Sequence, residues 1–190
     1  MWDILLERIQ RGPHYENYEE LFRYDIEQAI NSIEYSDLAI TRPDLTTMDD
    51  LERYESHNMA MFAYADIDFM HSSIDVRDDF PTLREVIWIA QLMARIGNWV
   101  STWEREFREG DYSSGVVVSA LEAGVISREE ITELDGADPE RIEACIERIR
   151  ESGIEKELLT RWELSHHRLR NYNEELSRFD LGPFIDGTEE

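Results

Sequence analysis

The chain has 190 residues and a mass of 22.5 kDa, and 42% of its residues are hydrophobic, which excludes an intrinsically disordered chain and fits one domain. Forty-three acidic and nineteen basic residues give a formal net charge of -24, which repels phosphates, so we expect neither nucleic acid nor an anionic membrane surface as a partner. No apolar run is long enough to span a membrane and no secretory signal is seen, so we expect a soluble, cytoplasmic protein.

The acidic composition combines many arginines with a single lysine, Lys156, and resembles proteins from salt-loving archaea. In molar salt, repulsion between surface carboxylates is screened within about 3 Å. We therefore interpret the charge as an adaptation to the solvent. Cys145 is the only cysteine, which excludes an intrachain disulfide, and its spacing to Ile142, Ile146 and Ile149 predicts a core position.

Apolar residues recur with the helical period along almost the whole chain, and no segment alternates strictly enough to predict a strand. Proline, glycine and capping residues mark the ends of the expected helices. These helices cover about residues 2–10, 15–40, 46–75, 83–109 and 112–123, a short segment after Ser127, residues 139–151 and a last segment after Gly153, followed by a flexible tail, 183–190.

Three helix starts carry local signals. Thr46 or Thr47 could cap the third helix, Ser127 followed by Glu130 resembles a capping box, and Asp138 precedes a proline at the first turn. Residues 83–109 have the clearest apolar face and are expected to be buried. The sequence therefore predicts an all-α helical bundle, a single domain over residues 1–190.

A polar pattern interrupts this helix, because Asn98, Thr102 and Glu106 recur every four residues and so share one face. Arg105 returns to within about 20° of Asn98. Amide, hydroxyl and carboxylate oxygens suit Mg²⁺, and a guanidinium suits a diphosphate oxygen. The same stripe could instead only form hydrogen bonds within the bundle. Towards the helix start we expect this face to continue through mostly apolar or small residues: Ala94, Gln91 and Ile87.

The stretch 98–106, followed by Glu109-Gly110-Asp111, resembles the second metal-binding motif of class I terpene synthases. In that family an Asn, a Ser or Thr and a Glu bind one Mg²⁺, and a basic residue before the Glu contacts diphosphate. The resemblance implies that Asn98, Thr102 and Glu106 are metal ligands and that Arg105 contacts diphosphate.

Two further segments extend the resemblance. Arg53, in the stretch 51–53, is similarly placed to the family's diphosphate-sensing arginine, and Arg178 resembles the arginine of its carboxy-terminal Arg-Tyr pair, with Phe179 in place of the tyrosine. The resemblance covers about residues 15–182 and implies the fold of the second half of a terpene synthase domain. It also implies that Arg53 and Arg178 are catalytic residues that bind diphosphate.

The chain departs from the family at several points. The aspartate-rich first metal motif has no counterpart, Trp99 replaces an acidic residue, and His57 and Asn58 stand where the family often has a small residue at a helix break. Aromatic residues that could wall a pocket for a carbocation, or belong to an ordinary core, are Phe62, Tyr64, Phe69, Trp88, Trp99 and Trp103.

The resemblance implies a carbon–oxygen lyase that ionises or cyclises a prenyl diphosphate with Mg²⁺, provided that another chain supplies the aspartate-rich half. We expect the protein to form a homo-oligomer or to bind a second chain that carries this half. The alternative is a non-catalytic helical interaction protein that retains the fold. A third interpretation is an unrelated helical bundle whose motif matches are accidental.

Overall fold

The fold is all-helical, as the periodicity predicted, over the residues that the computed structural model describes, 2–134, 138–176 and 180–188. These residues contain no strand. The helices are α1 (Trp2–Ile9), α2 (Tyr15–Thr41), η1 (Pro43–Leu45), α3 (Met48–Arg53), η2 (Glu55–Met59), α4 (Met61–His71), α5 (Phe80–Arg108), α6 (Gly115–Glu122), α7 (Arg128–Thr132), α8 (Pro139–Glu151), α9 (Ile154–Glu175) and α10 (Gly182–Gly187).

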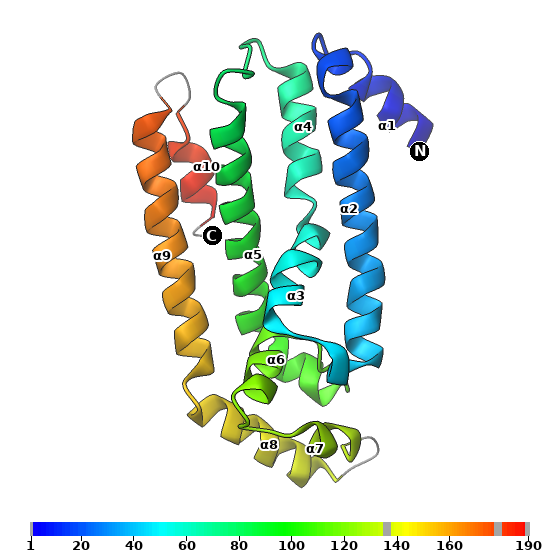
Figure 1. Ribbon diagram of the computed structural model, residues 1–190, viewed down its shortest axis with the longest axis vertical. Helices are drawn as coiled ribbons and strands as arrows, with labels where there is room; N and C mark the ends of the chain where they lie inside the picture. The colour runs from blue at the N-terminus through cyan, green and yellow to red at the C-terminus, as the bar shows by residue number, and fades with distance from the viewer. Residues whose placement is uncertain (1, 135–137, 177–179, 189–190) are drawn as a thin grey trace.

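Three long helices, α2, α5 and α9, run along the long axis of the molecule (Figure 1). The shorter α3, η2 and α4 follow one another between α2 and α5, while α6, α7 and α8 close one end. Helix α5 packs most extensively on α9, and α2 packs on both α4 and η2. Helix α5 is therefore central and presents one side to α9 and another to η2 and α4.

The predicted helix starts are formed by the expected side chains. Ser127 Oγ accepts a hydrogen bond from the Glu130 backbone N–H at 3.1 Å, and Glu130 Oε2 accepts one from the Ser127 N–H at 2.9 Å, which completes the capping box. Asp138 caps α8 with a single bond, because its Oδ1 accepts from the Glu140 backbone N–H at 3.2 Å. Of the two candidates for α3, Thr47 is the cap, since its hydroxyl accepts from a backbone N–H in the first turn.

The single helix predicted over residues 46–75 is wrong, because the chain forms α3, η2 and α4 there. Ala60 lies between η2 and α4 with φ 53°, in the left-handed region that residues with a side chain rarely occupy. The break turns Glu55 and Ser56 inward, where each is at most 1% exposed. Further along, the stretch expected to be a tail contains α10, whose Ile185 is 3% exposed.

Two apolar cores lie along α5. The one around its carboxyl end contains Trp99, Trp103 and Phe107, none more than 1% exposed, together with Cys145 as predicted. Burying a side chain such as that of Phe107 stabilises the fold by about 1.5–3 kcal/mol. Trp99 packs so closely on Gly115 of α6 that a Cβ atom at that glycine would lie 2.5 Å from the ring. The other core joins the amino half of α5 to α2, α4 and α9.

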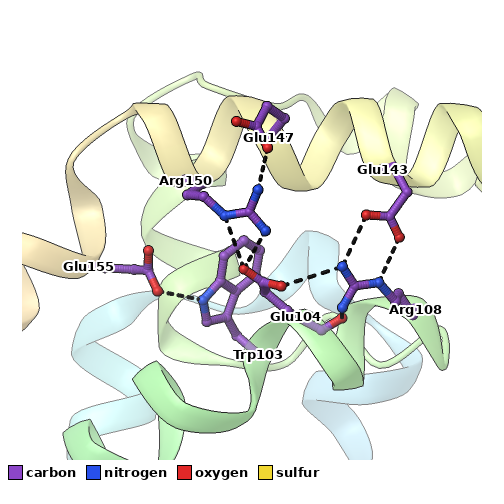
Figure 2. Close-up of polar contacts among 7 residues, drawn as sticks. All are labelled: Trp103, Glu104, Arg108, Glu143, Glu147, Arg150 and Glu155. Atoms are coloured by element: carbon purple, nitrogen blue, oxygen red, sulfur yellow. Dashed lines mark hydrogen bonds and ion pairs between the residues drawn. The ribbon is translucent and has the colours of Figure 1, made fainter.

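Ion pairs tie the end of α5 to α8 (Figure 2). Arg108 donates to both carboxylate oxygens of Glu143, at 2.6 and 3.0 Å, and Arg150 of α8 donates to Glu104 of α5 at 2.6 Å. Arg108 also reaches Glu104 at 3.3 Å, so one carboxylate joins the two arginines. No helix among the described residues is both long and apolar enough to cross a membrane.

Candidate functional site

A polar stripe runs along one side of α5 and includes the three residues singled out in the sequence. At about 100° per residue its members fall within an arc of about 80°. Besides the expected Gln91, the same arc carries two arginines, Arg84 and Arg95, so this side of the helix is more polar than the sequence analysis expected. The stripe is Arg84, Gln91, Arg95, Asn98, Thr102 and Glu106.

The predicted metal ligands are partly exposed, and each side chain has a partner on α5. Asn98 Oδ1 accepts a hydrogen bond from Arg95 at 2.9 Å, and the Thr102 hydroxyl donates to the Asn98 backbone carbonyl at 2.7 Å. Glu106 Oε1 lies 3.4 Å from the Arg105 guanidinium. Successive members are about one turn apart, about 6 Å along the helix axis, and these three residues would hold the ion.

The three predicted diphosphate arginines differ in their positions. Arg105 is on α5 beside Glu106, and its side chain is 65% exposed. Arg53 is exposed at the end of α3, with its guanidinium carbon 5.9 Å from the centre of the Tyr54 ring. Arg178 lies outside the described residues. Of the two arginines that the structure describes, Arg105 lies beside the stripe on the same helix.

A buried ion pair that the sequence analysis missed adjoins Asn98. Arg95, with an 11% exposed side chain, contacts Glu55 of η2 at 2.5 Å. The same carboxylate oxygen accepts a hydrogen bond from Ser36 of α2 at 3.1 Å. The Arg95 guanidinium carbon also lies 5.4 Å from the centre of the Trp99 ring. Three elements, α2, η2 and α5, therefore converge on this arginine.

A second buried group of charges lies nearer the start of α5. Arg84 forms two hydrogen bonds with Asp25 of α2, one of them at 3.1 Å, and lies 3.7 Å from Asp66 of α4. Asp25 and Asp66 are 3% and 0% exposed. The Arg84 guanidinium carbon lies 4.0 Å from the centre of the Phe62 ring. Because two carboxylates share one guanidinium, the group carries one excess negative charge when both are ionised.

Two effects raise the pKa of Asp66 to about 8. Burial is the larger, and the neighbouring carboxyl group of Asp25 adds to it. Neither oxygen of the Asp66 side chain accepts a hydrogen bond, so the ionised form is poorly solvated. A proton on Asp66 removes the excess charge and can be donated to Asp25. At neutral pH Asp66 therefore retains its proton.

The aromatic residues proposed as pocket walls are dispersed. Trp99 and Trp103 belong to the core, and Tyr64 is 68% exposed. Phe62 and Trp88 flank His57, with ring centres 5.9 and 5.6 Å from the imidazole, and burial lowers the pKa of His57.

Phe69 lines an apolar cavity of about 260 Å³ between α4, α5 and α10. Ile87 also lines it, and Ile87 lies three turns before Asn98 on nearly the same side of α5, about 16 Å away along the axis. A larger cavity, of about 580 Å³, adjoins the far end of α5 at Gly110, and both Arg42 and Arg128 line it. None of the stripe residues lines this larger cavity.

No group of three or more His, Cys, Asp or Glu residues among the described residues forms a metal site. The predicted metal ligands Asn98, Thr102 and Glu106 include only one carboxylate. They therefore differ from a site built from three or more such side chains. No family model, curated protein or solved structure matches the chain. The resemblance to terpene synthases thus rests on the quoted residues alone.

Proposed function

We propose that this chain is terpene-synthase-like and binds the Mg²⁺-complexed diphosphate of a prenyl diphosphate on the exposed part of the α5 stripe. The observation that supports this most is the placement of Asn98, Thr102 and Glu106 on one partly exposed face. Arg105 adjoins the same carboxylate and could contact a diphosphate oxygen.

The donor set suits an ion that is shared with a substrate. Mg²⁺ keeps several waters in proteins and usually binds through one or two carboxylates together with substrate phosphates. One carboxylate, Glu106, with an amide and a hydroxyl beside it, matches that use better than it matches an all-protein cage. When bound, Mg²⁺ would stabilise the negative charge of the departing diphosphate.

The chain also offers a place for a hydrocarbon group. The 260 Å³ cavity is lined mainly by apolar side chains, and one of them, Ile87, lies on nearly the same side of α5 as Asn98. Burial there would remove a prenyl chain from water. Ionisation and cyclisation require the aspartate-rich half, which we propose comes from a second, different chain.

A second candidate function is that of a non-catalytic interaction protein. Its support is a row of exposed isoleucines along α2, where Ile30, Ile33 and Ile40 are 53%, 64% and 42% exposed. Their spacing of three and seven residues places them on one side of the helix. Exposed apolar side chains gathered in this way are typical of an association surface.

Calorimetry with a non-hydrolysable prenyl diphosphate analogue tests the first proposal, with and without Mg²⁺ in molar salt. We expect Mg²⁺-dependent binding that Asn98→Ala and Glu106→Ala each abolish. Glu85→Ala is the matched control, because Glu85 is also on α5 but pairs with Arg168 of α9. Absence of binding to the wild-type protein would refute the proposal, and a stable oligomer in sedimentation would then support the second candidate.

A further inference from the structure

Two arginines flank the proposed ligands on α5, and the fold holds them differently. Arg105, which the resemblance implies as the diphosphate contact, is 65% exposed and touches Glu106 at 3.4 Å. Arg95 is 11% exposed and donates to Asn98 Oδ1 at 2.9 Å. Arg95 is therefore the arginine whose guanidinium is held against a proposed metal ligand, Asn98.

The surroundings of Arg95 hold its guanidinium in one orientation. Glu55, 1% exposed, contacts it at 2.5 Å and also accepts the hydrogen bond from Ser36. The ring of Trp99 lies beside it, at 5.4 Å. A buried guanidinium with a charged partner and an aromatic neighbour loses most of its rotational freedom. Glu55 also offsets the positive charge, which would otherwise repel a cation bound by Asn98.

The hydrogen bond from Arg95 fixes the orientation of the Asn98 carboxamide, because it needs the oxygen, and not the NH₂ group, on the side that faces Arg95. Without a donor at that place, the amide could turn and present its NH₂ group to a cation. A carbonyl oxygen has two lone pairs, so Oδ1 can accept from Arg95 and still bind a metal ion. Outer partners of this kind orient metal ligands, and their loss typically weakens metal affinity about 10–100-fold.

We propose that Arg95, held by Glu55 and Ser36, is a positioning residue that fixes the oxygen of Asn98 towards the diphosphate site. This inference rests on the proposed function, because it assigns a role within the same site. It adds a residue, Arg95, that lies outside the terpene-synthase-like motif at 98–106. The contact is built from α2 and η2 as well as α5, so the helix break at Ala60 contributes to the site.

The test compares Mg²⁺-dependent binding of inorganic pyrophosphate by calorimetry in molar salt. Arg95→Gln alone leaves Glu55 buried and unpaired, so the double variant Glu55→Gln, Arg95→Gln is made to restore charge balance. We expect the double variant to fold, shown by its circular dichroism and melting temperature, and to bind about 10–100-fold more weakly. Arg108→Gln is the control, since it also removes a guanidinium of α5 that pairs with glutamate, and we expect it to bind like the wild type. Wild-type affinity in the folded double variant would overturn the inference.

A measurement without ligand separates this inference from the proposed function. The side-chain amide signals of Asn98 are assigned in the ¹⁵N–¹H spectrum by their loss in Asn98→Ala. Because the bond to Oδ1 polarises the carboxamide and fixes its orientation, we expect shifts displaced from those of a free amide in the wild type and close to them in the double variant. Unchanged signals would overturn the inference. If the wild type fails to bind pyrophosphate while the signals depend on Arg95, the proposed function is refuted and the positioning contact stands.

Discussion

Replacing Asp66 by asparagine is predicted to stabilise the protein near pH 8 and to have little effect near pH 4. Asp66 is 0% exposed, and burial beside Asp25 raises its pKa from the ordinary 3.8 to about 8. Between these two values the folded protein retains a proton that the unfolded chain has lost. The contribution of Asp66 to the free energy of unfolding must therefore fall as the pH rises through this window, and it stops falling above about pH 8.

The expected size follows from proton linkage. One proton corresponds to about 1.4 kcal/mol for each pH unit, so the penalty from Asp66 grows by about 3 kcal/mol between pH 5 and pH 7. An asparagine side chain at this position would retain the size and a hydrogen-bond donor without the charge. The difference in unfolding free energy between Asp66→Asn and the wild type should rise by that amount over the interval.

Urea unfolding followed by circular dichroism, at each pH unit from 4 to 9 and at constant salt, measures this difference. Contributions from carboxyl groups distant from Asp66 cancel when the variant is subtracted from the wild type. Asp68→Asn is the control, because Asp68 is exposed on the same helix. A difference for Asp66→Asn that does not change between pH 5 and pH 8 would refute the reasoning.

Three further predictions concern local structure, each measured by urea unfolding. Ala60→Gly should stabilise the protein by about 0.5–1 kcal/mol, because glycine removes the cost of a left-handed alanine and adds a smaller entropic one; a loss of stability would contradict the assigned conformation. Ser127→Ala should cost about 1 kcal/mol through loss of the α7 cap, and Ser127→Thr, as its control, should cost less. Trp103→Phe should cost about 1–3 kcal/mol, because it removes the 2.9 Å hydrogen bond from the indole N–H to Glu155 and leaves unfilled volume. An unchanged urea midpoint would mean that neither the hydrogen bond nor the volume contributes to stability.

Helix starts and ends were predictable where their chemistry is local. The cap at Ser127 involves Glu130, three residues away, and Gly153 ends α8 with φ 84°, which glycine adopts without strain. Such signals lie within a few positions of the feature that they form. The outlines of α2, α5 and α8 in the structure accordingly agree with the predicted ranges to within about three residues.

The break at Ala60 was missed because alanine strongly favours helix and the apolar period continues through the segment. Contacts distant in sequence determine it. Glu55 meets Arg95, forty positions later, and Ser36, nineteen positions earlier. Burial of that glutamate with its partners outweighs the local preference for a continuous helix.

The spacing of Asn98, Thr102 and Glu106 is enough to predict that they share one face of a helix. It does not predict which residues of other helices contact that face. Arg95 lies three residues before Asn98, and Gln91 lies four residues before Arg95. This spacing could have predicted that the polar face continues towards the helix start. The acids that meet this face, such as Asp25, come from other helices, and sequence spacing does not select them among 43 carboxylates. Their pairing is decided by packing.

The contact between Trp99 and Gly115 has a consequence for evolution. In the resemblance to terpene synthases, Trp99 stands in place of an acidic residue, and its ring occupies the space in which any side chain at position 115 would begin. A smaller residue at position 99 would leave a hole that a residue larger than glycine at position 115 could fill. Among homologues the two positions should therefore change together.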